Sequence, residues 1–202
     1  MYDFIEEIKD IYRLKVPFEN IYTSVFLIRS PSGVILVDSA TTAEDVDEYI
    51  LPALKKTKTS FSDVTTLILT HAHGDHAGGL SRLTSLIPSV EVIRDVRELF
   101  DGICTYPMAG HTYNCIGVLD TRTNTLISGD GLQGAGVDKY RCYTESPKAY
   151  LETVKRIQND KRIENLLFSH SYEPWNKNHA YGRMAVDTCL AQCKKYINGE
   201  EK

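Results

Sequence analysis

The chain has only five cysteines in 202 residues, and none of them forms a CxxC pair. They are Cys104, Cys115, Cys142, Cys189 and Cys193. An odd number at wide spacing argues against a disulfide framework, so we expect reduced thiols. Cys189 and Cys193 share a predicted helical face with Val186, Leu190 and Ile197, which favours burial as small apolar side chains over metal binding.

Long apolar segments and runs of basic residues are absent as well. No stretch approaches the roughly 18 consecutive apolar residues of a membrane span, and residues 1–7 lack the basic start and apolar centre of a signal peptide. The net charge of -4 and the lack of a Lys/Arg run give no general attraction to phosphate backbones. We therefore expect a cytoplasmic protein with neither a membrane nor a nucleic acid as partner.

Length and composition predict one globular domain. A chain of 202 residues with 42% hydrophobic and 25% charged residues can bury a sizeable core, while a second full domain would be crowded. We expect residues 1–202 to form this single domain, and the sequence makes no prediction of its oligomeric state.

Two runs of expected elements follow the same order along the chain. The first run has a hairpin of residues 22–29 and 34–38 around Pro31-Ser32-Gly33, a helix capped by Thr41 with Glu44, and a strand over 65–70. The second has a hairpin of residues 116–119 and 125–128, a helix with Ser146 as cap and Pro147 first, and a strand that ends before His170. A last helix over 183–197 follows. The repeated order predicts an internal duplication.

The apolar runs 25–28 and 34–37 do not alternate with polar residues, which indicates strands that are covered on both faces. Two sheets between helical layers would satisfy this pattern and predict an α/β fold. Ligands of layered folds gather where strand ends meet. The duplicated pattern places Asp38, His71, Asp130 and His170 at such ends.

The densest group of chemically capable residues is the stretch 70–79, Thr-His-Ala-His-Gly-Asp-His-Ala-Gly-Gly. Its three imidazoles and one carboxylate follow an apolar run directly, and these nitrogen and oxygen donors suit zinc, iron or manganese. Of the six histidines, His111 and His170 also lie at strand or loop edges, where they can face a shared pocket. His179 lies in a polar stretch and is expected to be a solvated surface residue.

In this order, the HxHxDH motif, Gly110-His111, Ser128-Gly129-Asp130 and Ser169-His170 resemble the metallo-β-lactamase superfamily along nearly the whole chain. The resemblance implies a four-layer αββα sandwich of two pseudo-symmetric halves. It also implies that His71, His73 and His111 bind one metal ion, that Asp75, His76 and His170 bind a second, and that Asp130 bridges them. Asp38 matches an aspartate that orients the metal-binding loop in this family, although a turn or helix-cap role fits its position equally well.

Two divalent cations about 4 Å apart can share one water and lower its pKa toward neutrality. Zinc is the cation that we expect, with iron or manganese also suited to these donors. The resemblance therefore predicts a metal-dependent hydrolase that cleaves a small ester, lactone or thioester. Asp75 and Asp130 are the expected catalytic carboxylates. Tyr172 is a candidate hydrogen-bond donor to an oxyanion, with Tyr113, Tyr140 and Tyr143 as competitors.

Other superfamily activities fit the sequence less well. Many zinc β-lactamases resemble this chain but have a cysteine at the position of Asp130, whereas glyoxalase II and acyl-homoserine lactone lactonases resemble it with the carboxylate. Glyoxalase II normally continues into a helical glutathione-binding region, and only residues 171–202 follow His170 here. The alternatives are a persulfide dioxygenase with a single iron, a phosphodiesterase such as a ribonuclease Z-like nuclease, and a non-catalytic metal-binding scaffold. The glycine-rich residues 131–137 are expected to border the substrate pocket.

Overall fold

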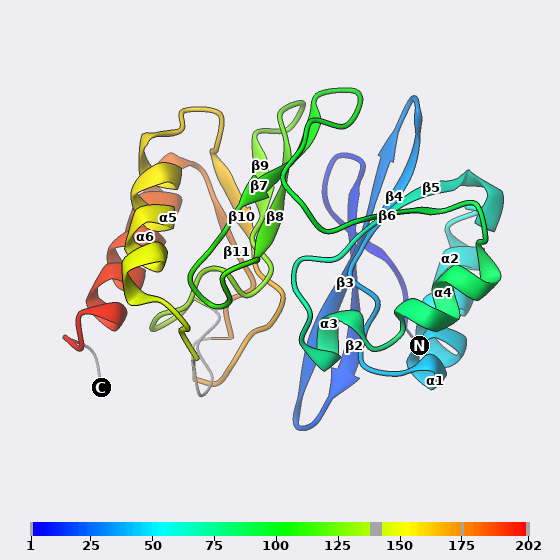
Figure 1. Ribbon diagram of the computed structural model, residues 1–202, viewed down its shortest axis with the longest axis horizontal. Coiled ribbons are helices and arrows are strands. Elements are labelled where there is room, and N and C mark those ends of the chain that lie inside the picture. The colour runs from blue at the N-terminus through cyan, green and yellow to red at the C-terminus, as the bar shows by residue number, and fades with distance from the viewer. Residues whose placement is uncertain (1, 138–142, 175, 201–202) are drawn as a thin grey trace. The chain divides into compact units, whose positions relative to one another are not determined.

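The computed structural model describes residues 2–137, 143–174 and 176–200. It divides the chain into two compact units, which we call the first unit (Met1–Arg94) and the second unit (Asp95–Lys202). Each unit has its own sheet, helices and apolar core (Figure 1). The single domain predicted for residues 1–202 stays a prediction.

The first unit is built on a six-stranded sheet in the order β1-β2-β3-β4-β5-β6. Its strands are β1 (Ile5–Ile8), β2 (Ile11–Phe18), β3 (Ile21–Ser30), β4 (Gly33–Val37), β5 (Val64–Ile68) and β6 (Glu91–Ile93). The pairs from β1 to β4 are antiparallel, whereas β4 pairs with β5 and β5 with β6 in parallel. The predicted hairpin around the Pro31-Ser32-Gly33 turn is confirmed as β3 and β4. Strands β1, β2 and β6 had no counterpart in the sequence analysis.

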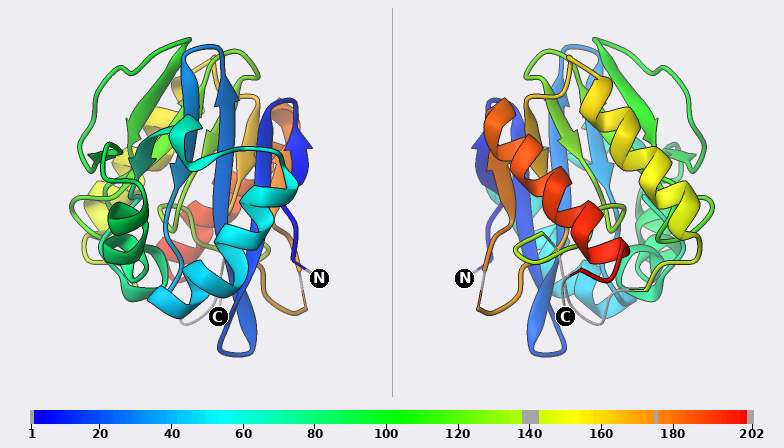
Figure 2. Two further views of the ribbon diagram at one scale, coloured as in Figure 1. Left: turned by 90° about the vertical axis from the view of Figure 1, so that its right-hand side faces the viewer. Right: turned by 90° about the vertical axis from the view of Figure 1, so that its left-hand side faces the viewer.

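The chain between β4 and β6 forms six helical segments, and the helical run of residues 43–56 lies along one face of this sheet (Figure 2, left). They are α1 (Ala43–Asp45), the π-helical η1 (Val46–Ile50), α2 (Leu51–Lys56), the 3-10 turn η2 (Phe61–Asp63), α3 (Gly74–Ala77) and α4 (Leu80–Leu86). The helix start predicted at Thr41 is wrong by one residue. Thr42 is the N-cap: its Oγ1 accepts from the Asp45 N–H at 3.1 Å, and Asp45 Oδ2 accepts from the Thr42 N–H at 3.0 Å.

Side chains on both faces of β3 and β4 are buried, as the non-alternating sequence predicted. Val25 and Leu27 pack in the core under the helices with Leu36, and their neighbours Phe26 and Ile28 on the opposite face are fully buried as well.

The second unit has a five-stranded sheet in the order β11-β10-β9-β8-β7. Its strands are β7 (Ile103–Pro107), β8 (Ile116–Asp120), β9 (Thr125–Ile127), β10 (Asn165–Leu167) and β11 (His179–Tyr181). Helices α5 (Pro147–Asn159) and α6 (Arg183–Ile197) lie side by side over this sheet (Figure 2, right). Ser146 caps α5 with its Oγ, which accepts from the Ala149 N–H at 3.2 Å, so the predicted start of this helix is confirmed.

The predicted duplication is confirmed in the strand pairing. An antiparallel hairpin is followed by a helical crossover to a parallel strand in both units: β3, β4 and β5 in the first, and β8, β9 and β10 in the second. Asp38 follows β4 and Asp130 follows β9, while His71 and His170 come shortly after β5 and β10. Corresponding strand ends of the two units thus carry Asp38 and three of the candidate metal ligands.

The described cysteines Cys104, Cys115, Cys189 and Cys193 are free thiols and buried, as expected, whereas Cys142 lies outside the described residues. Burial raises the pKa of the Cys104 and Cys189 thiols, which keeps them protonated and unreactive. In the part of the chain that the structure describes, no helix is long and apolar enough to cross a membrane.

Gly78 allows the histidine loop to lie against the chain that leaves β4. A Cβ atom at this position would lie only 1.8 Å from the carbonyl oxygen of Thr41, whereas a Cβ at Gly74, in the same loop, would meet nothing within 4 Å. The packing therefore requires a glycine at Gly78 but not at Gly74.

We expect Gly78→Ala to lower the free energy of unfolding of the metal-free protein by about 2 kcal/mol or more, because backbone atoms must move apart. Gly74→Ala is the matched control and should change stability by less than about 1 kcal/mol. Urea denaturation of both variants measures the difference, and equal stabilities would refute the proposed close packing.

Candidate metal centre

The histidine motif of the first unit lies in the loop after β5 and in the short helix α3. His71 and His76 are buried, and the backbone of His76 is tied to the segment after β4, because its carbonyl accepts from the Ser39 N–H at 2.7 Å and from the Ser39 hydroxyl at 2.9 Å. The segment after β4 therefore holds this loop in place.

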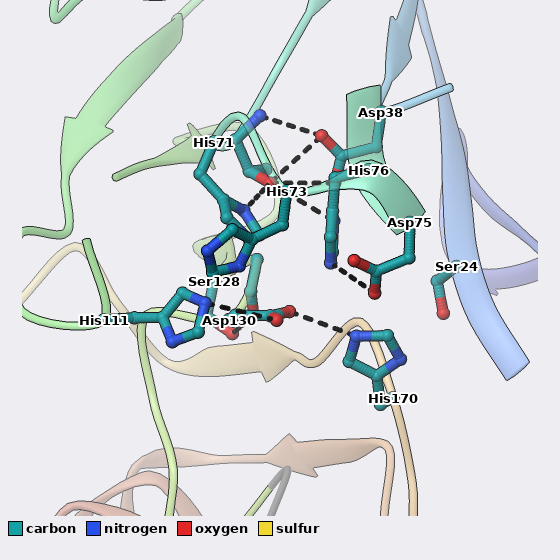
Figure 3. A network of polar contacts seen from close by, with 12 residues as sticks. Ser24, Asp38, His71, His73, Asp75, His76, His111, Ser128, Asp130 and His170 are labelled. Atoms are coloured by element: carbon teal, nitrogen blue, oxygen red, sulfur yellow. Dashed lines mark hydrogen bonds and ion pairs between the residues drawn. The ribbon is translucent and has the colours of Figure 1, made fainter. Parts of the chain in front are cut away.

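Asp38 is fully buried and organises the same loop (Figure 3). Its Oδ1 accepts from the Thr70 N–H at 2.8 Å, and its Oδ2 lies 2.7 Å from Nδ1 of His76. The Thr70 hydroxyl contacts both carboxylate oxygens, at 3.0 and 2.9 Å. A carboxylate that accepts the Nδ1 proton of an imidazole leaves the Nε2 lone pair available for a metal ion. The orienting role considered for Asp38 agrees with these contacts better than a turn or cap role.

His71 and His73 direct one nitrogen each at the same small region. His71 Nε2 lies 3.1 Å from His73 Nδ1. Two nitrogen ligands of one tetrahedral zinc ion, each about 2.0–2.1 Å from the metal, are separated by about 3.3 Å. The observed spacing fits two ligands of one cation.

Asp75 and His76 form a second pair of donors in this unit. Asp75 Oδ2 lies 3.3 Å from Nε2 of His76, the nitrogen that the Asp38 contact leaves available (Figure 3). This distance again fits two ligands of one tetrahedral ion.

In the second unit, Asp130 lies between two buried imidazoles. Its Oδ1 is 3.3 Å from His170 Nε2, and its Oδ2 is 3.7 Å from His111 Nε2 (Figure 3). Each oxygen of the carboxylate therefore faces a different histidine.

The loop that carries His111 is fastened to the start of α5. The Gly110 carbonyl accepts from the Ser146 N–H at 3.1 Å, and the His111 carbonyl accepts from the Glu145 N–H at 3.2 Å. Gly110 has a φ of +149°, and a Cβ there would lie 2.7 Å from Cα of Tyr150. Thus the predicted Gly110-His111 pair depends on the absence of a side chain at Gly110.

The tyrosine candidates differ in their surroundings. Tyr172 is partly buried, with its ring centroid 5.9 Å from that of His170, whereas Tyr113 is 64% exposed and Tyr143 is 55% exposed. Tyr140 lies outside the described residues. The catalytic role of Tyr172 stays a prediction.

His179 differs from the expectation of a solvated surface residue. It is partly buried in β11, and its ring stacks on that of Tyr181 with centroids 4.1 Å apart. Within the described part of the chain, it does not belong to the groups of donors that could hold a metal ion.

Each unit contributes donors of the kinds that bind divalent cations. The first unit offers three imidazole nitrogens and a carboxylate, and the second offers two imidazole nitrogens and a carboxylate. These donors suit zinc, iron or manganese, and the described cysteines take no part. Thr70 and Gln133, both in contact with candidate ligands, were not identified from the sequence. Their hydroxyl and amide groups carry no recognisable motif.

Comparison with known proteins relates the chain to one superfamily through a partial sequence match and through its fold. Residues 20–102 match the model of the metallo-beta-lactamase superfamily. A metallo-beta-lactamase crystal structure from Hirschia baltica is similar with a TM-score of 0.71 and 20% sequence identity, covering 97% of both chains. The chain therefore carries a sequence pattern of this superfamily and has the metallo-β-lactamase fold. The resemblance read from the motifs and the α/β fold class are confirmed.

Among the similar curated proteins are several hydroxyacylglutathione hydrolases. A hydroxyacylglutathione hydrolase of Legionella pneumophila is 26% identical over 154 residues, which are 63% of this chain and 60% of the relative. Another from Haemophilus ducreyi is 26% identical over 195 residues, 83% of this chain and 78% of the relative. In the first of these matches, the aligned part spans about 60% of the relative's length.

We expect Asp38→Ala to destabilise the metal-free protein by about 3 kcal/mol, because the Thr70 N–H and the His76 ring lose a buried acceptor. Zinc affinity should also fall about 10- to 100-fold, because the His76 ring loses its orientation. Urea denaturation and zinc titration measure both effects.

Asp47→Ala is the control, because Asp47 forms an exposed ion pair with Arg82 at 2.9 Å. It should change stability by less than about 1 kcal/mol and leave zinc binding unchanged. If Asp38→Ala behaves in the same way, Asp38 does not organise the loop.

Proposed function

We propose that this chain is a metal-dependent hydrolase that cleaves a small ester, lactone or thioester. In this proposal residues 1–202 work as a single domain, and the donors of both units converge on two divalent cations, most simply zinc. His71, His73 and His111 would hold one cation, Asp75, His76 and His170 the other, and Asp130 would bind both.

The observation that carries the proposal is the position of Asp130 within the second unit. Its Oδ1 faces His170 at 3.3 Å and its Oδ2 faces His111 at 3.7 Å. Because the two oxygens face different histidines, the carboxylate can bind a separate cation through each oxygen. In the first unit, His71 and His73 form one pair of neighbouring donors, and Asp75 and His76 form another. Each pair would supply two ligands to one of the two cations.

When bound, such a pair of cations lowers the pKa of water toward neutrality and polarises the carbonyl of a substrate. The protein holds the donors rigidly for this purpose, since Asp38 and the Ser39 contacts fix the His76 loop. Asp75 and Asp130 are the proposed catalytic residues, because a carboxylate oxygen at the reacting centre can accept the proton of the attacking water. Tyr172 would donate its hydroxyl proton in a hydrogen bond to the developing oxyanion.

The proposed substrate class rests on two arguments. First, Asp130 provides a carboxylate where the sequence comparison above expects cysteine in many zinc β-lactamases. Second, the Legionella and Haemophilus relatives carry the name hydroxyacylglutathione hydrolase, and that name denotes the cleavage of a thioester. A small thioester or lactone is thus the preferred test substrate, and the proposed partner of the protein is a small molecule.

We expect the wild-type protein to bind close to two metal ions per chain. Asp130→Ala should retain fewer metal ions and lose at least about 100-fold in kcat/KM, because the bridge is removed. His179→Ala is the matched control, a histidine outside the donor groups, and should keep metal content and activity. Elemental analysis and hydrolysis assays with lactones, thioesters, β-lactams and phosphodiesters measure these outcomes on the same samples.

Two results would contradict the proposal. Full activity of Asp130→Ala would show that the reaction needs no bridging carboxylate at this position. One iron per chain together with persulfide-dependent oxygen consumption would replace hydrolysis by an oxidation.

Tyr172→Phe should lower kcat about 10- to 100-fold with little change in KM, because a hydrogen bond to the oxyanion strengthens only during the reaction. Tyr113→Phe, at an exposed tyrosine, should behave as the wild type. If the two variants have equal kcat values, Tyr172 does not assist the reaction.

A further inference from the structure

Gln133 brings its side chain to His111 from the loop that follows Asp130. The residue is buried, with 4% of its surface exposed, and its amide Nε2 lies 3.0 Å from His111 Nδ1. The same Nδ1 lies 2.8 Å from the backbone carbonyl oxygen of Tyr143. Two polar groups of the second unit therefore meet at one ring nitrogen.

The Tyr143 carbonyl decides which nitrogen of His111 carries the proton. A carbonyl oxygen only accepts hydrogen bonds, so Nδ1 must be protonated to donate to it. An N–H of the Gln133 amide facing this protonated nitrogen would be repelled. The nitrogen and oxygen of an amide have nearly the same size, so the side chain can turn its oxygen to Nδ1 without any change of shape.

The lack of a partner for the amide oxygen is a second reason for such a turn. As placed, Gln133 Oε1 is buried without a hydrogen-bond partner among the described residues. A buried acceptor without a partner is unfavourable. When the amide oxygen is turned to His111, the Nδ1–H donates a three-centre hydrogen bond to this oxygen and to the Tyr143 carbonyl.

We propose that Gln133 is a positioning residue for His111. Its amide oxygen accepts a hydrogen bond from the Nδ1–H of His111, and this contact directs Nε2 toward the metal ion. The inference rests on the function proposed above, in which His111 Nε2 is a metal ligand. It assigns His111 two neutral acceptors, whereas His76 has the carboxylate of Asp38.

The backbone of Gln133 is held firmly enough for this task. The hydroxyl of Tyr150, a fully buried residue of α5, accepts from the Gln133 N–H and donates to the Gln133 carbonyl, both at 2.7 Å. The first turn of α5 also binds the His111 loop through Ser146. One helix thus fixes both partners, which keeps the distance between the amide and the imidazole constant.

Gln133→Met and Gln133→Glu separate this role from simple packing. Methionine has a similar length and shape but accepts no hydrogen bond at this position, whereas glutamate can only accept when ionised. We expect Gln133→Met to weaken the binding of one zinc equivalent about 10- to 100-fold, measured by competition with a chelator. Gln133→Glu should bind zinc at least as tightly as the wild type. Gln158→Leu, at an exposed position of α5, is the control and should bind zinc normally.

The metal-free protein provides a second measurement that involves neither metal nor activity. Nitrogen-15 NMR of the neutral histidine rings should show His111 protonated at Nδ1 in the wild type and in Gln133→Glu. A loss of zinc affinity in Gln133→Glu as large as in Gln133→Met would overturn the inference, as would a wild-type His111 protonated at Nε2. Unfolding curves of each variant show whether it is folded, and an unfolded Gln133→Met leaves the decision to the wild-type NMR spectrum and Gln133→Glu.

The outcomes also separate this inference from the proposed function. If the wild type binds no metal ion, the proposed function fails, and the NMR spectrum of the metal-free protein still tests whether His111 Nδ1 carries the proton that the hydrogen bond to Gln133 requires. If the wild type binds two metal ions and hydrolyses its substrate while Gln133→Met binds zinc normally, only the role of Gln133 is refuted.

Discussion

A single buried carboxylate determines the shape of the histidine loop in the first unit. Asp38 accepts hydrogen bonds from the Thr70 backbone, the Thr70 hydroxyl and the His76 ring, and it is fully buried. A carboxylate in such a place is stable only when all of its partners are present, because the loss of solvation must be offset by hydrogen bonds. The loop is therefore coupled to the end of β4 and cannot move independently of it.

The two units reach a similar result by different means. In the first unit, a carboxylate accepts a hydrogen bond from a candidate ligand, and in the second a backbone carbonyl and, in our inference, an amide oxygen do so. An anionic acceptor makes an imidazole more basic than a neutral acceptor does, because it stabilises positive charge on the ring. His76 would consequently be a stronger donor to its proposed cation than His111 would be to the other.

The sequence was sufficient for the parts of the structure that depend on local pattern. The spacing of His71, His73, Asp75 and His76 and the order of the later ligands need no tertiary information, and the range of α6 follows from its apolar face. The cap of α1 did depend on tertiary packing. Thr41 and Thr42 both offer a hydroxyl three residues before an acidic side chain, and the close approach of Gly78 to the Thr41 carbonyl helps fix which of them begins the helix. The role of Gln133 was also hidden, because a lone amide has no characteristic spacing.

The lack of a side chain at Gly110 explains why the candidate ligand His111 can follow so closely on a tight turn. Gly110 must lie against Tyr150 for His111 to reach the edge where Asp130 lies, and the same tyrosine holds Gln133 through its hydroxyl. Tyr150 therefore connects the His111 loop, the loop after Asp130 and the core of the second unit. Because this residue is fully buried, any change that loosens the packing of α5 would reach the imidazole of His111 without touching it. The stability of that core and the orientation of the proposed ligand are consequently not independent properties.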